Sequence, residues 1–134
     1  MVKEFPDQPD ITPVFCTSES MHGQCYHLNH PYHFATDTER HIIPEGFVYD
    51  GASIPRLIWS PLGVTPDGLH RAATLVHDYL YINRRHFSYT RKEVDKLFLR
   101  QMLILGMNRR KAKLMYRGVR LFGWVMGGGW PKGE

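Results

Sequence analysis

Three residues near the middle of the chain have the types and spacing of a hydrolytic site. His77 and Asp78 are adjacent, and Asp95 follows eighteen residues after His77. An aspartate that accepts a hydrogen bond from one imidazole nitrogen fixes the tautomer and leaves the other nitrogen as a general base. The pattern therefore predicts that Asp95 orients His77, provided that two antiparallel helices bring them together.

Asp78 has the chemistry of a cation ligand. On a helix it points roughly 100° away from His77, where it could hold a hard cation such as calcium if further oxygen ligands are present. The loop that begins at Asp50 and Gly51 could supply them, because glycine lets backbone carbonyls approach closely. The alternative interpretation is a buried polar network that pins two helices to this loop.

The element that must position these residues is an amphipathic helix over residues 68–84. Its apolar residues recur at three- and four-residue steps, which is the helical period. They are Leu69, Ala72, Ala73, Val76 and Leu80. Thr65 is a suitable N-cap for it, Pro66 suits the first turn, and Asp67 is an acid near the positive helix end. His77 and Tyr81, at i and i+4, share one face.

Two further helices follow. Thr90 and Glu93 form a capping box that opens the second helix, and Gly106 ends it. Asn108 is the expected cap of the third helix, which reaches about Phe122. The residues expected to face inward are Val94, Leu97, Phe98, Gln101, Met102, Leu105, Leu114, Met115, Val119 and Phe122.

The N-terminal half has the alternation of strands. Short apolar-polar runs lie in ITPVFCT, QCYHLNH, YHFAT and RHII, and Pro44-Glu45-Gly46 predicts a hairpin turn before a strand at residues 47–49. We therefore predict a single α+β domain, in which a small strand-rich N-terminal half packs on a three-helix C-terminal unit. Its parts are a polar leader (1–10), strands and a loop (11–63), three helices (64–124) and a glycine-rich tail (125–134).

Composition restricts the class of protein. The chain has 134 residues, 43% of them hydrophobic, and a formal net charge of +4, as expected of one folded domain. We expect Cys16 and Cys25 to be reduced core thiols. The first residues do not resemble a signal peptide, and no apolar run is long enough to predict a transmembrane segment.

Four segments carry a resemblance to a known family. The runs GFVYDGASIPR, HRAATLVHDYLY, RKEVDKLFLRQM and LMYRGVRLFGW resemble an uncharacterised domain of unknown function that is common in tailed phages and some bacteria. The match runs from about residue 40 to 124. It implies a phage-associated protein of the host cytoplasm or the virion, with other phage proteins as possible partners.

A second resemblance concerns the order of motifs. The order of motifs is similar to that of prokaryotic and fungal secretory phospholipases of the A-two type. The motifs are DG-x-S, then HD-x-x-Y, then a helix with D-x-x-F. The resemblance implies that His77 is the general base, that Asp95 orients it and that Tyr81 supports the pair. It also implies that Asp78 binds calcium together with the loop at Asp50 and Gly51. Those enzymes are secreted and disulfide-bonded, whereas this chain has no cysteine near the motif.

Three other candidate sites are weaker. One set of residues matches the types of the metal ligands in metal phosphohydrolases, namely His70, His77, Asp78 and Asp95. However, two histidines seven residues apart on a helix are roughly 10 Å apart along its axis, which is too far for both to bind one metal easily. Ser53 lacks the flanking glycines of a nucleophile elbow. The histidines near Cys25 lack a zinc-site spacing, so solvated side chains are the simpler interpretation. They are His22, His27, His30 and His33.

The third helix carries a basic stripe. Its members fall at i, i+4, i+8 and i+11, namely Arg109, Lys113, Arg117 and Arg120. A solvated face is the default for such a stripe. It could also lie on anionic membrane lipid, with Trp124 and Trp130 entering the interface. Phosphates of nucleic acid or an acidic partner protein would suit it equally, although sequence-specific recognition of nucleic acid is not indicated.

The sequence thus leads to two hypotheses. The first is a phage-associated hydrolase acting on an ester, with phospholipid as the favoured substrate and calcium as the cofactor. In the second, the chain is a non-catalytic virion or assembly protein in which His77 and its neighbours form a structural network. An enzyme requires His77 to reach solvent through a cleft, whereas a structural network does not.

Overall fold

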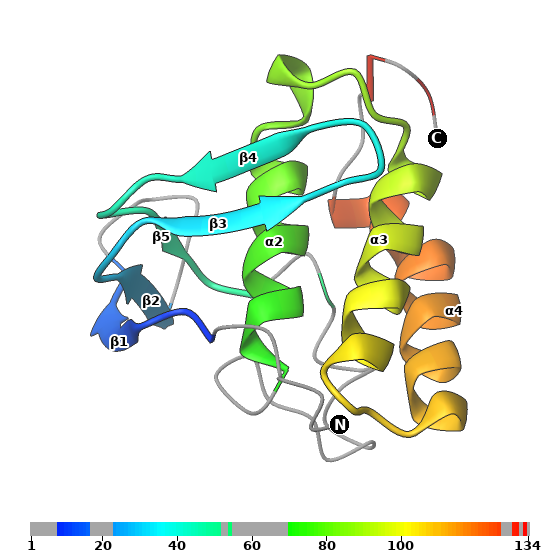
Figure 1. The fold of residues 1–134 in the computed structure, drawn as a ribbon, viewed down its shortest axis with the longest axis horizontal. Coiled ribbons are helices and arrows are strands. Elements are labelled where there is room, and N and C mark those ends of the chain that lie inside the picture. Colours follow the sequence, from blue (N-terminus) through cyan, green and yellow to red (C-terminus); the bar gives the residue numbers. More distant parts are fainter. Residues whose placement is uncertain are drawn as a thin grey trace, which may run out of the picture.

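The computed structural model describes residues 8–16, 23–51, 54, 70–126, 130, 131 and 133, and for residues 122–126 the backbone alone. The described elements, in chain order, are β1 (Ile11–Phe15), β2 (Gln24–Leu28), β3 (Tyr32–Ala35), β4 (Arg40–Ile43), β5 (Val48–Tyr49), α2 (Arg71–Ile82), a 3₁₀ turn (Arg84–His86), α3 (Arg91–Ile104) and α4 (Arg109–Met126). Among the described residues five strands precede three helices, and Figure 1 shows the strands packed beside these helices. The predicted α+β class is therefore confirmed.

The strands form two antiparallel sheets. One has the order β1-β2-β5, and β3 pairs with β4 in the other. The expected turn is present, since the N–H of Phe47 donates to the carbonyl of Pro44 at 3.2 Å and Gly46 has a φ of 87°. The predicted hairpin across it is wrong, however. Because Gly46 and Phe47 form backbone hydrogen bonds with Leu28, the turn docks on β2, and β5 continues there.

Cys16 and Cys25 form a disulfide, so the prediction of two reduced core thiols is wrong. Cys16 follows β1 directly and Cys25 lies in β2. The antiparallel register of the two strands brings their Cα atoms to 5.1 Å, within the range that a disulfide spans. Sequence spacing alone does not fix this register, which is why the pairing was missed.

The N-terminal caps of α3 and α4 follow the sequence signals. The Thr90 hydroxyl accepts from the Glu93 N–H at 3.1 Å, and the Glu93 carboxylate accepts from the Thr90 N–H at 2.9 Å, which confirms the capping box. The side chain of Asn108 accepts from the N–H of Arg110 at 2.9 Å and caps α4. Helix α2 is shorter than predicted and begins at Arg71 with His70 at the N-cap position, so the prediction that Thr65 caps this helix is wrong. Residues 65–67 lie outside the described residues.

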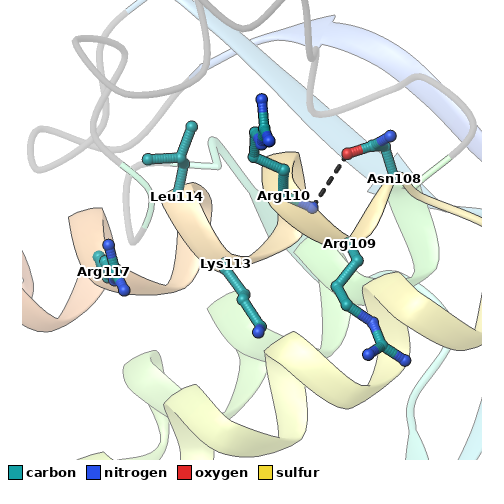
Figure 2. A pocket seen from close by; sticks show the side chains of 6 residues that line it. All are labelled: Asn108, Arg109, Arg110, Lys113, Leu114 and Arg117. Atoms are coloured by element: carbon teal, nitrogen blue, oxygen red, sulfur yellow. Dashed lines mark hydrogen bonds between the residues drawn. The ribbon is translucent and has the colours of Figure 1, made fainter.

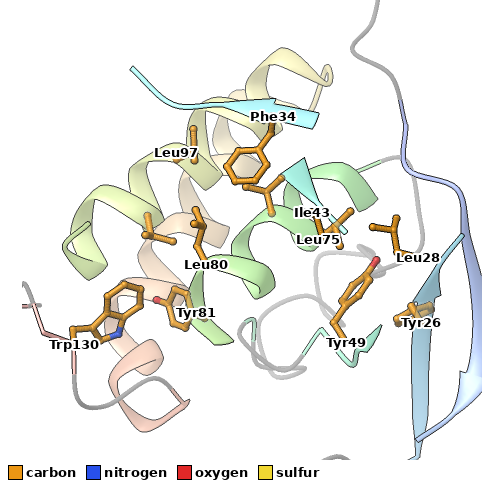
Figure 3. Packing of buried hydrophobic residues seen from close by; sticks show 12 residues of the cluster. Tyr26, Leu28, Phe34, Ile43, Tyr49, Leu75, Leu80, Tyr81, Leu97 and Trp130 are labelled. Carbon is orange, nitrogen blue, oxygen red and sulfur yellow. The ribbon is translucent and has the colours of Figure 1, made fainter. Parts of the chain in front are cut away.

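Helix α2 lies at the centre of the fold. Figure 1 shows the β3–β4 hairpin crossing it, with α3 beside it and α4 beyond α3. Side chains of α2 contribute to both buried clusters, with Leu75 and Leu80 in one and Ala72 and Ala73 in the other. Figure 3 shows the first cluster, which joins the strands to α2 and α3.

Two surface predictions for the C-terminal part are wrong. Trp130, expected on the surface where it could enter a lipid interface, is only 8% exposed and packs edge-on against Tyr81 at 5.0 Å between ring centroids. Leu114, expected to face inward, is 45% exposed, whereas Met115 and Val119 are buried as predicted. Among the described helices, none has both the length and the apolar character needed to cross a bilayer.

Candidate active site

Helices α2 and α3 bring His77 and Asp95 into contact. Nε2 of His77 lies 2.7 Å from Oδ1 of Asp95, and neither side chain is exposed. Because an ionised carboxylate only accepts hydrogen bonds, Nε2 carries the proton and donates it to Asp95. This is the contact that the sequence predicts for an oriented base. It leaves Nδ1, on another edge of the ring, as the nitrogen with acceptor character.

Asp95 is the centre of a larger network. Tyr81 Oη donates to its Oδ1 at 2.6 Å, while Nη1 of Arg120 and Nη1 of Arg91 lie 3.0 and 3.4 Å from its Oδ2. Four donors from three helices therefore surround one buried carboxylate, which offsets the cost of taking its charge out of water.

The surroundings keep Asp95 ionised. Burial alone would raise its pKa, but the hydrogen bond from His77 and the electrostatic interaction with it, followed by the hydrogen bonds of Tyr81 and Arg120, lower the pKa below the ordinary value. Burial and the neighbouring Asp95 charge strongly raise the pKa of Tyr81. Tyr81 therefore stays protonated at neutral pH and acts as a hydrogen-bond donor.

Aromatic rings pack against the imidazole. The ring centroid of His77 lies 4.3 Å from that of Tyr81 and 4.6 Å from that of Phe98. These contacts and the hydrogen bond to Asp95 fix both the position and the rotation of the ring, as a pre-positioned base requires.

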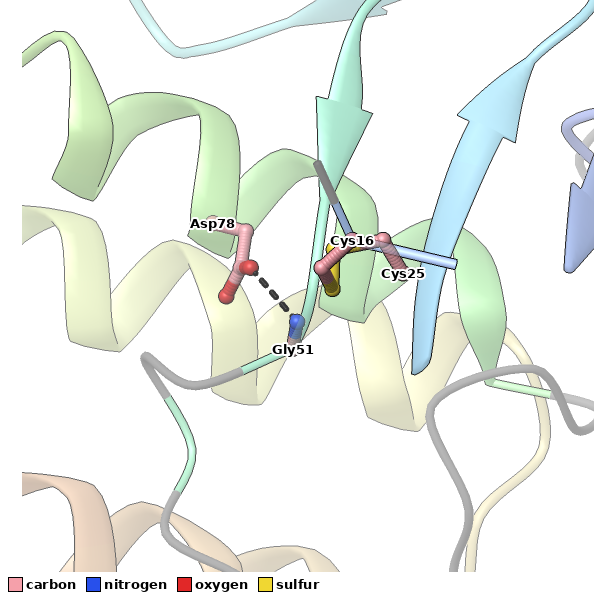
Figure 4. Close-up of a disulfide and its surroundings, with 4 residues drawn as sticks. All are labelled: Cys16, Cys25, Gly51 and Asp78. Atoms are coloured by element: carbon pink, nitrogen blue, oxygen red, sulfur yellow. Dashed lines mark hydrogen bonds between the residues drawn. A yellow bond between two sulfur atoms is a disulfide. The ribbon is translucent and has the colours of Figure 1, made fainter. Parts of the chain in front are cut away.

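Asp78 meets the loop at Gly51, as Figure 4 shows. Its Oδ2 accepts from the N–H of Gly51 at 2.9 Å, and Asp78 is only 1% exposed. The positive φ of Gly51, 77°, suits glycine, because a Cβ is disfavoured there. Asp78 and the Asp50 loop are thus neighbours, but the contact present is an N–H bond rather than shared carbonyl ligands.

The described residues assemble no group of three or more His, Cys, Asp or Glu side chains that could hold a metal. Asp78 and the half-buried Asp50 are hard oxygen ligands that fit calcium by type. Ser53 and His22 lie outside the described residues.

Two arginines of the site were not predicted in this role. Arg91 stands four residues before Asp95 in the same helix, so helical spacing could have indicated it. Arg120 was placed on the basic surface stripe, but it turns to Asp95 and is only partly exposed. No local signal links Arg120 to a residue twenty-five positions earlier. The side chain of Trp124 is outside the described part.

Comparisons with known proteins identify relatives whose function is not established. A family model described as "Protein of unknown function (DUF1353)" matches residues 26–119, which include every described residue of the site except Arg120. The chain is 35% identical over 86 residues to "Uncharacterized protein y4jT" of Sinorhizobium fredii (strain NBRC 101917 / NGR234). That alignment covers 63% of this chain and 25% of the relative, so the chain spans about a quarter of that protein. No solved structure matches.

Proposed function

We propose that this chain, which belongs to the DUF1353 family of proteins of unknown function, is a hydrolase that uses His77 as a general base. The observation that carries the proposal is the 2.7 Å contact between His77 Nε2 and Asp95 Oδ1. An orienting carboxylate on one nitrogen prepares the other to take a proton.

The network suits the charge changes of such a reaction. When Nδ1 removes a proton from water, the imidazole becomes positive, and the ionised Asp95 on its other nitrogen stabilises that charge. Tyr81, Arg91 and Arg120 hold the carboxylate in place and keep it from turning away. The hydroxide equivalent then attacks an acyl carbon, and the His77 proton passes to the leaving alkoxide.

Phospholipid ester is the substrate class we propose, in a reaction assisted by calcium on Asp78 and the Asp50–Gly51 loop. A bound calcium ion would supply positive charge to an oxyanion. Asp78 lies next to His77 in α2, and the hydrogen bond from Gly51 brings the loop to Asp78. The remaining ligands would be backbone oxygens or water.

A second candidate function is a non-catalytic phage virion or assembly component. It is favoured by burial, because the side chains of His77 and Asp95 are both 0% exposed, so His77 does not reach solvent through a cleft in this structure. A network that is buried except for part of Arg120 joins α2, α3 and α4 without any turnover. In the hydrolase, by contrast, the site must open to admit water and the ester.

Product analysis separates the two functions. The wild-type chain and His77→Gln are incubated with phospholipid micelles and with short-chain soluble esters, and released acids are identified by mass spectrometry. His41→Gln is the matched control, because His41 is also mostly buried and hydrogen-bonded, to Tyr89 at 2.7 Å, outside this site. The hydrolase requires acid release by wild type and His41→Gln but not by His77→Gln. Absence of release by wild type, with calcium present, would favour the structural component.

A further inference from the structure

The outer face of α4 carries a basic depression, which Figure 2 shows. A cavity of about 570 Å³ is lined by Asn108, Arg109, Arg110, Lys113, Leu114 and Arg117. Arg109 and Lys113 point to one side of the helix, and Arg110 and Leu114 point to the other. This face differs from the predicted stripe, because Arg120 has left it for Asp95 and Arg110 has joined it.

No acidic side chain among the described residues neutralises the four cations of the depression. All four are exposed, and within the described part of the chain none of them forms an ion pair. By comparison, Arg100 on α3 is paired with Asp37 at 2.6 Å. Uncompensated like charges on one face attract an anionic surface, and the attraction weakens with salt.

Exposed leucines lie among these cations. Leu114 is 45% and Leu121 is 63% exposed. Each residue of an α-helix is rotated by roughly 100° about the helix axis from the one before. By this rotation the two leucines and two of the arginines lie on one strip of α4 that is about 60° wide. The members of this strip are Arg110, Leu114, Arg117 and Leu121. The buried residues of the helix lie on the opposite side, namely Ala112, Met115 and Val119.

We propose that this face of α4 docks on an anionic phospholipid membrane. Basic residues interleaved with leucines on a helix that lies flat match both parts of a lipid interface, the phosphate headgroups and the upper acyl chains. Nucleic acid would use the cations alone and would leave the leucines without a role. The inference stands apart from the proposed hydrolysis, because docking is measured without turnover.

Vesicle co-sedimentation tests this docking. Wild type should bind vesicles of phosphatidylcholine mixed with phosphatidylglycerol, and bind far less to phosphatidylcholine alone. Arg110→Gln with Arg117→Gln should weaken binding on the order of 25-fold, from about fivefold per cation near such a surface. Leu114→Ser with Leu121→Ser should weaken binding to the same vesicles.

The matched control is Lys92→Gln with Lys96→Gln, which removes two exposed cations from α3 and should change binding by no more than roughly twofold at physiological salt. Circular dichroism verifies that each variant folds. The proposal would be overturned if wild type bound neutral vesicles as tightly as anionic ones. It would also be overturned if the control pair lost as much binding as the arginine pair, or if the leucine pair lost none. Tighter binding to a single-stranded oligonucleotide than to the anionic vesicles would also overturn it.

Discussion

Arg120 of α4 and the buried Asp95 of α3 form a partly buried ion pair, with Nη1 3.0 Å from Oδ2. Asp95 also accepts from His77 of α2. One carboxylate thus links helices α2, α3 and α4. The Asp95 carboxylate belongs to the candidate site and also stabilises the fold. Experiments on the site must therefore measure folding as well as activity.

Replacing Asp95 with asparagine should destabilise the chain strongly. The change leaves Arg91 and Arg120 without their carboxylate, and breaking a buried pair in this way costs about 3–5 kcal/mol. Urea unfolding followed by circular dichroism measures the loss. The control is Asp37→Asn, which removes an exposed pair with Arg100 and should cost less than about 1 kcal/mol. Equal losses in the two variants would contradict the network.

The free energy of unfolding should depend on pH at acidic values because of Asp95. Its pKa is lower in the folded chain than the ordinary value of 3.8, so the folded state favours the ionised form. The stabilisation is therefore complete above the ordinary pKa and is lost as pH falls through the folded-state pKa. Urea midpoints measured from neutral pH downward should fall more steeply below about pH 4 in wild type than in Asp95→Asn. Parallel curves would show that Asp95 is not stabilised as an anion.

Calcium should raise the melting temperature if Asp78 is its ligand. At a hundred times its dissociation constant, a ligand adds about 2.7 kcal/mol of stability. Asp78→Asn keeps an oxygen that can accept from Gly51 but removes the charge, so the variant should fold and lose the calcium shift. A shift that persists in Asp78→Asn would place the cation elsewhere. No shift in wild type would remove calcium from the mechanism.

Reduction of the Cys16–Cys25 disulfide should lower stability moderately. The bridge closes a short loop, with a sequence separation of 9, and a loop of that size contributes about 2.5 kcal/mol on the chain-entropy estimate. Urea unfolding with and without dithiothreitol measures the difference, and thiol titration confirms the redox state. The double change Cys16→Ser with Cys25→Ser should match the reduced protein and be insensitive to dithiothreitol.

Sequence signals that act over a few residues predicted this fold well. The capping box at Thr90, the cap at Asn108 and the turn glycine Gly46 depend on neighbours within four residues, and each forms as expected. The contact between His77 and Asp95 was also foreseen, because a short connection between two helices favours an antiparallel pair.

Features that depend on distant pairing were missed. The choice of β2 as the partner of β5 depends on how the turn docks at Leu28. Arg120 turns inward because a buried carboxylate from another helix lies within its reach. Trp130, in a glycine-rich tail, is buried against Tyr81, a residue far away in sequence. None of these partners is encoded by local periodicity.

The most direct test of a catalytic His77 is to measure kcat/KM for ester hydrolysis and the free energy of unfolding on one preparation of His77→Gln. General base catalysis contributes about 10²–10⁴-fold. The account predicts a loss of kcat/KM in that range while most of the protein remains folded at the assay temperature. Hydrolysis that is unchanged in folded His77→Gln would contradict a catalytic role and leave the dyad as a structural link between α2 and α3.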